Sequence, residues 1–219
     1  MFELPKAASA CLLTGAVSIT PQQFAQLKQR LEKPGRASKA APEAAHAIGA
    51  RRTHQVILGI DPSLRGTGYG VIRIGRSTPE LLAEGTIKAD NRWARSRCLV
   101  QITHTLRDVV AKHHPTTAVV EGLFFAQNLQ TALIMGEARG AALVAVAEAG
   151  LEIFEIAPRK VKQAIVGYGA AQKSAVARMV QRMLSLAAPP APDAADALAL
   201  ALAFAQENGR YSLTPLKAI

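Results

Sequence analysis

The sequence predicts an α/β fold built on a mixed five-stranded sheet with helices on both faces, and two observations favour it. Three short apolar runs follow one another at 55–61, 66–74 and 81–87, and their links are too short to hold crossover helices. After them, helical periodicity alternates with short β-branched runs, the order typical of parallel strands joined by helices. We therefore expect three antiparallel strands followed by parallel ones.

The first apolar run is the strand relative to which we predict the direction of a later one. Val56-Ile57-Leu58-Gly59-Ile60-Asp61 is continuously apolar until its final carboxylate, which is typical of a buried strand. A helix is expected over 93–113, where apolar residues recur on one stripe and Pro115 stops the pattern. A helix followed by a buried run completes a crossover, so the strand expected at 117–121 should lie parallel to the first.

The second half of the chain continues this alternation. An alanine-rich helix is expected over 128–149, and its Gly136 and Gly140 leave a smooth stripe on which another backbone can pack. The other elements expected are a strand at 152–156, a short helix from Pro158, and helices at 173–186 and 193–206.

Three segments are expected along the 219 residues. Residues 1–54 form a basic leader, with one short helix at 20–33 and then an Ala-, Arg-, Lys- and Pro-rich linker. Residues 55–207 form the folded domain, and 208–219 a tail with no assigned role. The leader is either a basic DNA-binding arm or an overextended gene start, and we favour the second because the linker carries no specifying pattern.

Composition narrows the class of protein. The formal charge of +10 indicates a polyanionic partner such as nucleic acid. The two cysteines, Cys11 and Cys98, fit neither a disulfide framework nor a zinc pattern, which favours a reduced, cytoplasmic protein. No uninterrupted apolar run is long enough to span a bilayer, so no membrane segment is expected.

Four acids stand where catalytic ligands could meet. Asp61 and Glu121 each end a predicted buried strand, while Asp193 and Asp196 share one face of the last helix. Taken singly, each has a structural explanation as a turn residue or a helix cap. Together they would repel one another unless divalent cations neutralised them, and carboxylate oxygens favour Mg²⁺ or Mn²⁺ over zinc. Four acids can hold two such ions for phosphodiester hydrolysis.

The order of motifs over residues 55–206 resembles the RuvC family of Holliday-junction resolvases, which have an RNase H-like fold. The matching stretches are Gly59-Ile60-Asp61-Pro62, Gly66-Thr67-Gly68-Tyr69-Gly70, Val120-Glu121, Val161-Lys162-Gln163, Lys173-Ser174 and Asp193-Ala194-Ala195-Asp196-Ala197. The resemblance implies that Asp61, Glu121, Asp193 and Asp196 are the catalytic, metal-binding acids, holding two Mg²⁺ ions that Mn²⁺ can replace.

The resemblance also implies DNA-binding residues around these acids. Phe124 matches an aromatic residue that stacks on an unpaired base, and Phe125 stands beside it; a hydrophobic anchor for the loop is the alternative. Lys162 and Lys173 match basic residues near the scissile phosphate. Arg139 matches a further motif, and its role is left open between DNA contact and an intramolecular ion pair.

The function implied is a structure-selective endodeoxyribonuclease that resolves four-way DNA junctions. It is expected to act as a homodimer, with the Gly136 and Gly140 stripe in the interface, and to work with a branch-migration complex of the RuvA/RuvB type. The alternatives are an RNase H-fold nuclease of another substrate class, such as a RuvX/YqgF-like RNA-processing protein, and a non-catalytic DNA-binding relative.

Overall fold

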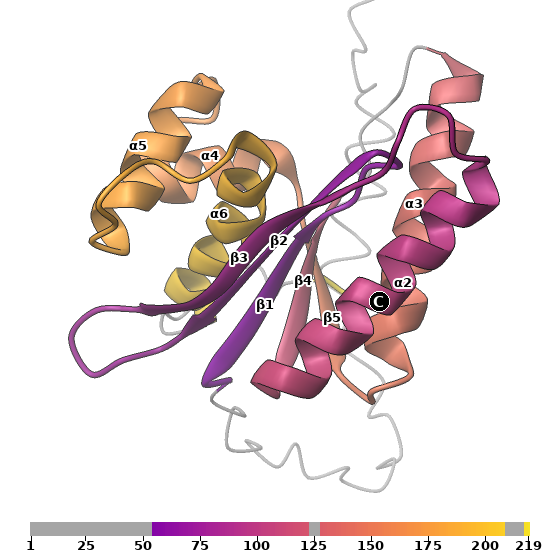
Figure 1. Ribbon diagram of the computed structural model, residues 1–219. Coiled ribbons are helices and arrows are strands. Elements are labelled where there is room, and N and C mark those ends of the chain that lie inside the picture. Colours follow the sequence, from indigo (N-terminus) through magenta and orange to yellow (C-terminus); the bar gives the residue numbers. More distant parts are fainter. Residues whose placement is uncertain (1–53, 123–127, 209–216) are drawn as a thin grey trace, which may run out of the picture. The chain divides into compact units, whose positions relative to one another are not determined.

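The computed structural model describes residues 54–122, 128–208 and 217–219 (Figure 1). Its strands are β1 (Val56–Asp61), β2 (Gly66–Arg73), β3 (Glu80–Lys88), β4 (Thr117–Glu121), β5 (Glu152–Ile156) and β6 (Lys217–Ala218). Its helices are α2 (Arg95–His113), α3 (Leu129–Ala147), α4 (Pro158–Val166), α5 (Lys173–Met183) and α6 (Pro192–Asn208). Where an element was predicted within the described residues, its bounds differ from the predicted ones by at most three residues. The helix expected at 20–33 lies outside the described residues.

The strands form one mixed sheet in the order β3-β2-β1-β4-β5-β6. The first three strands pair antiparallel, whereas β1, β4 and β5 pair parallel, as the sequence predicted. The sixth strand was not predicted. It consists of two residues of the C-terminal tail that pair antiparallel with β5, and so short a segment carries no readable alternation.

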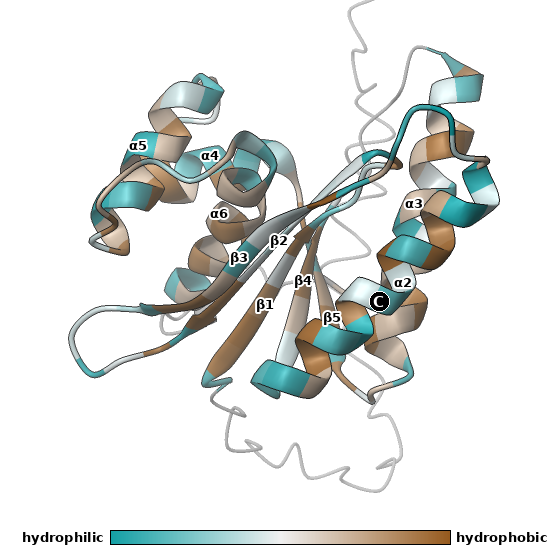
Figure 2. Cartoon of the chain, viewed as in Figure 1, coloured by the Kyte–Doolittle hydropathy of each residue, from teal (hydrophilic) through white to brown (hydrophobic). Residues whose placement is uncertain are grey.

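Helices cover both faces of the sheet, which confirms the predicted layers (Figure 1). Along β1, Leu58 and Ile60 pack with α2 and α3, while Ile57 faces the opposite core formed with α4, α5 and α6. β1 accordingly buries apolar side chains on both sides of the sheet, and it is brown in Figure 2. This alternation decides which side chains reach α6.

Helix α6 lies unusually close to the sheet, because glycines of β1 and β2 face its backbone. A Cβ added at Gly59 would come within 2.0 Å of the carbonyl oxygen of Ala197, and one at Gly68 within 1.9 Å of that of Asp193. At Gly70 it would come within 2.5 Å of the Leu198 side chain. No side chain other than hydrogen fits between these strands and the helix.

Among the residues that the structure describes, α3 is the one helix long and apolar enough to cross a membrane by length and composition alone. Its buried side chains pack on α2 and the sheet, and core helices of soluble proteins meet the same two criteria. The sequence showed no uninterrupted apolar run here because Glu137 and Arg139 interrupt it.

Candidate active site

The strand register brings Asp61 and Glu121 side by side. In the parallel pair of β1 and β4, Ile60 lies opposite Val120, so the next residue of each strand is a carboxylate at the same edge of the sheet. Because side chains alternate along a strand, both acids point to the α6 side, the side to which Ile57 and Val119 contribute core residues. Two strand-ending acids, predicted separately, thus form one pair.

Helix α6 adds a third acid to this pair. Asp196 lines the same pocket as Glu121, and its charge raises the pKa of both Asp61 and Glu121. Asp193 is placed differently: its backbone carbonyl covers Gly68, the partner of Asp61 in the β1–β2 ladder, and its Oδ2 lies 3.1 Å from where a Cβ on Gly66 would stand. The structure therefore groups three of the four predicted acids and sets Asp193 beside the start of β2.

Burial and like charge shift the titration of these groups. Burial, followed by the charges of Glu121 and Asp196, raises the pKa of Asp61 from 3.8 to about 7. The pKa of Glu121 is also raised, first by burial and then by the charge of Asp196. The hydrogen bond between the two carboxyl groups raises the pKa of Asp61 further and lowers that of Glu121, whose pKa stays raised overall.

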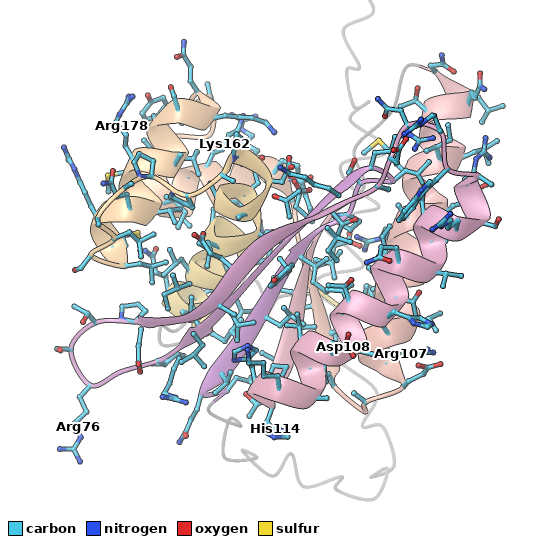
Figure 3. The ribbon with its side chains drawn as sticks, in the orientation of Figure 1. Arg76, Arg107, Asp108, His114, Lys162 and Arg178 are labelled. Carbon is cyan, nitrogen blue, oxygen red and sulfur yellow. The ribbon has the colours of Figure 1, made fainter. Side chains whose placement is uncertain are left out.

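Two lysines bring positive charge to the acids. Lys173, the first residue of α5, donates from Nζ to Asp196 Oδ2 over 2.6 Å, and this bond raises the pKa of the lysine. Lys162 of α4, labelled in Figure 3, lowers the pKa of Glu121 through its charge. Both predicted lysines line one pocket of about 210 Å³ with the acids Glu121 and Asp196. Its other lining residues are Pro158, Val161, Val176, Ala199 and Leu200.

Arg139 is buried behind the site, with 6% of its surface exposed. One guanidinium nitrogen donates to the backbone carbonyl oxygen of Glu121, and another lies 2.5 Å from Oε2 of Glu155. Of the two roles left open by the sequence, these contacts support the intramolecular ion pair. Sequence reasoning did not single out Glu155, although its side chain is only 24% exposed and a carboxylate so placed needs such a partner.

The remaining predicted contacts, Phe124 and Phe125, lie outside the described residues, and their stacking role stays a prediction. Among the residues described, no three His, Cys, Asp or Glu side chains already stand in a metal-binding arrangement. The charge of Lys173, which donates a hydrogen bond to Asp196, partly offsets the repulsion among Asp61, Glu121 and Asp196. Their chemistry still fits a hard divalent cation, since every donor is a carboxylate oxygen and their mutual repulsion is relieved by positive charge.

The sheet order and the converging carboxylates define a protein of the RNase H-like fold class with an acidic site at one sheet edge. The family model for "Crossover junction endodeoxyribonuclease RuvC" matches residues 57–204. The chain belongs to the RuvC family.

Individual relatives agree with this assignment. The RuvC protein of Coxiella burnetii (strain RSA 331 / Henzerling II) is 48% identical over 154 residues, which cover 70% of this chain and 89% of the relative. The RuvC protein of Halorhodospira halophila is 46% identical over 152 residues, which cover 69% of this chain and 90% of that relative. The structure of T. thermophilus RuvC in complex with a Holliday junction substrate superimposes with a TM-score of 0.68 at 32% identity, over 76% of this chain and 100% of that one.

Proposed function

We propose that the protein is a crossover junction endodeoxyribonuclease, which resolves four-way (Holliday) DNA junctions by paired, symmetric nicks during recombination and repair. The observation that carries this proposal is the convergence of Asp61, Glu121 and Asp196 with two lysines at one edge of the sheet. It is joined by membership of a family whose members are named for this activity and include one solved with a Holliday junction.

The proposed catalytic and metal-binding residues are Asp61, Glu121, Asp193 and Asp196. Two Mg²⁺ ions, replaceable by Mn²⁺, would supply Lewis acidity for phosphodiester hydrolysis when bound at these carboxylates. Because the pKa values of Asp61 and Glu121 are both raised, binding of cations at these carboxylates would be accompanied by release of protons. Lys162 and Lys173 are then placed to hold the charge of the scissile phosphate or its neighbours, and the products would carry 5′-phosphate and 3′-hydroxyl ends.

The helices next to the site supply charge for a DNA backbone. Residues 157–192 contain no Asp or Glu. Their basic residues are Arg159, Lys160, Lys162, Lys173, Arg178 and Arg182. Figure 3 shows Arg178 extending away from α5. These residues carry only positive charges and lie beside the acids, which supports binding of a polyanion. Phosphate contacts supply much of the affinity of proteins for DNA.

A homodimer accounts for paired nicks, since a two-fold dimer presents two identical sites to a two-fold substrate. Helix α3 offers a surface for it. Leu129, Leu133 and Val144 are exposed by 75%, 58% and 50% of their surface, at positions that share one stripe with Gly136 and Gly140. Nothing described lies within 4 Å of a Cβ added at either glycine. Large apolar side chains around such small residues support close helix-to-helix contact between two copies of α3.

The dimer is tested by Leu133→Lys in sedimentation velocity, with Val100→Lys as control on an exposed apolar residue of α2. Dissociation by the first variant alone is expected. A Leu133→Lys protein that stays dimeric would remove α3 from the interface. We further propose that the protein acts in the cytoplasm beside a branch-migration complex of the RuvA/RuvB type, which moves the junctions that it cuts.

The activity is tested with Asp61→Asn on a synthetic four-way junction in Mg²⁺, where cleavage should fall by about three orders of magnitude or more. Asp108→Asn, on an exposed acid of α2 labelled in Figure 3, is the matched control and should cut like the unmodified protein. Linear duplex and structured RNA are assayed in parallel. Nicking by Asp61→Asn at the normal rate would overturn the site, and preferred cleavage of RNA would overturn the substrate class.

A further inference from the structure

A compact basic and aromatic segment lies between β3 and α2. From Lys88 to Arg97 the chain holds four Lys or Arg residues and a single acid, Asp90. The same segment contains Trp93, the only tryptophan of the chain. None of the motifs assigned to the active site includes these residues. We name Lys88, Arg92, Trp93 and Arg97 the Trp93 surface.

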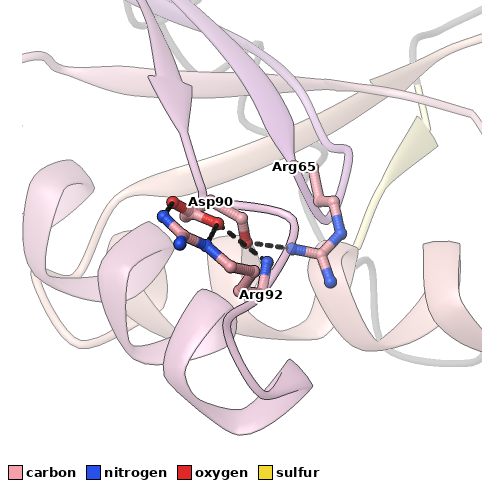
Figure 4. A network of polar contacts seen from close by, with 3 residues as sticks. All are labelled: Arg65, Asp90 and Arg92. Atoms are coloured by element: carbon pink, nitrogen blue, oxygen red, sulfur yellow. Dashed lines mark hydrogen bonds and ion pairs between the residues drawn. The ribbon is translucent and has the colours of Figure 1, made fainter.

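Arg65, in the turn that follows Asp61, holds this segment in place through hydrogen bonds. Its guanidinium donates to the backbone carbonyl oxygen of Asp90 (Figure 4). It also donates, over 3.3 Å, to the backbone carbonyl oxygen of Trp93. Arg92 completes the network by binding both carboxylate oxygens of Asp90, at 3.2 and 3.1 Å. The loop is therefore held in one position by side-chain contacts to the β1–β2 turn.

The network leaves an excess of positive charge on the outside. Asp90 is shared among three arginines, since Arg92, Arg65 and Arg97 all lower its pKa, the first by hydrogen bonds and the others by charge. The side chain of Arg92 is 90% exposed. Within the described part of the chain, neither Lys88 nor Arg97 has a carboxylate at ion-pair distance. Arg97 instead stacks over the Trp93 ring, 4.0 Å from its centroid.

The strand register places this charge at the same edge of the sheet as the acids. Lys88 ends β3 opposite Gly66, and Asp61 ends β1 opposite Gly68. The segment then continues into α2, on the face of the sheet opposite to α4 and α5 (Figure 1). Positive surfaces thus flank the carboxylates from both sides of the sheet.

We propose that the Trp93 surface is a second DNA-contact site, which binds backbone phosphates of the junction arm next to the catalytic acids. Arginines supply the phosphate contacts, and the Trp93 ring, held by Arg97, lies against the same strand. Arg65 is a positioning residue that fixes the surface relative to Asp61. The proposal rests on the proposed function, because it takes junction DNA as the ligand.

The single tryptophan gives a direct test in the unmodified full chain. A synthetic four-way junction is titrated in EDTA, which prevents cleavage, while the intrinsic fluorescence is recorded. Saturating DNA should change the intensity of Trp93 or shift its emission maximum, and the Trp93→Phe protein supplies the background. Fluorescence that stays constant while DNA binds, as followed by a label on the DNA, would overturn the proposal.

Charge is tested separately with Arg97→Gln against Arg107→Gln, a control on the same helix whose guanidinium pairs with Glu148. Arg97→Gln should weaken junction binding severalfold and lower the slope of log affinity against log salt by about one. If the unmodified protein and the Arg97→Gln and Arg107→Gln variants gave the same slope of log affinity against log salt, the proposed role of the Trp93 surface would be overturned, but not the proposed function. If the unmodified protein neither bound nor cut four-way junctions, the proposed function itself would be overturned.

Discussion

The ammonium group of Lys173 donates a hydrogen bond to the carboxylate of Asp196, with 2.6 Å between Nζ and Oδ2. A lysine at the first position of a helix is unfavourable for the helix dipole, so Asp196 rather than helical preference explains its place. This ion pair joins α5 to α6 and sets one positive charge against three buried or half-buried acids.

Replacing Lys173 by Gln should remove the charge that lowers the pKa values of Asp61 and Glu121. Both carboxyls would then hold their protons to higher pH, and the phosphate would lose a cation. Single-turnover cleavage of a four-way junction should fall by about 10²-fold at neutral pH. Lys112→Gln, on the exposed end of α2, is the matched control. Undiminished cleavage by the Lys173 variant would place this lysine outside the reaction.

The raised pKa of Asp61 predicts how stability depends on pH in the metal-free protein. Between its ordinary value of 3.8 and the folded value of about 7, the folded state keeps a proton that the unfolded state releases. The free energy of unfolding therefore falls as pH rises through this window. Asp61→Asn lacks this titration, so its advantage over the unmodified protein should grow from pH 5 to pH 8.

That difference is measured by urea unfolding in EDTA at both pH values, and about 1–3 kcal/mol at pH 8 is expected. Asp108→Asn, on an exposed residue of α2, should show no such pH-dependent gain. If Asp61→Asn were destabilising at pH 8, the acids would not repel one another as the burial and charges indicate.

Gly68→Ala should disturb the contact between β2 and α6. The added methyl group would meet the carbonyl oxygen of Asp193 at 1.9 Å, which forces the helix away from the sheet. A loss of about 1–3 kcal/mol or more in unfolding free energy is expected, together with reduced cleavage because Asp193 and Asp196 move with the helix. His104→Ala, at an exposed position of α2, is the control and should not destabilise the fold. Equal stability of the two variants would contradict the close approach.

Arg139→Leu tests the buried pair behind the site. The variant loses the bonds to Glu155 and to the Glu121 carbonyl, and about 3–5 kcal/mol of stability should disappear with them. Arg107→Leu breaks a comparable Arg–Glu pair between α2 and the end of α3, but that pair is about half exposed and should cost less than about 1 kcal/mol. If Arg139→Leu and Arg107→Leu lost similar amounts of stability in thermal unfolding, burial would not determine how much each ion pair contributes to stability.

Much of the fold was predictable because its signals are local. The antiparallel strands follow from links too short for helices, and the parallel placement of β4 follows from the helix before it. The pairing of Asp61 with Glu121 could be expected from two strands that both end on acids. The two-residue β6 could not, because only its partner β5 gives it a structure.

Other features of the site depend on distances that no pattern encodes. The sequence put Asp193 and Asp196 on one helix face, yet only Asp196 influences the titration of Asp61, since Asp193 lies against β2. The partner of Arg139 comes from a strand that begins thirteen residues later, and it appears only when α3 packs behind β4 and β5. The sequence placed Gly68 and Gly70 in a strand but gave no sign that both face the α6 helix, which the structure shows.

The glycine contacts have a consequence for how the active site is built. Where side chains separate a helix from a sheet, the distance between the two depends on the volume of those side chains. Ordinary substitutions over evolution therefore change that distance. Here the α6 backbone rests on the backbones of β1 and β2 at Gly59 and Gly68. The spacing between Asp61 and Asp196 is thereby set by peptide groups, whose dimensions never change. Substitutions in either core can accumulate while the carboxylates keep their separation.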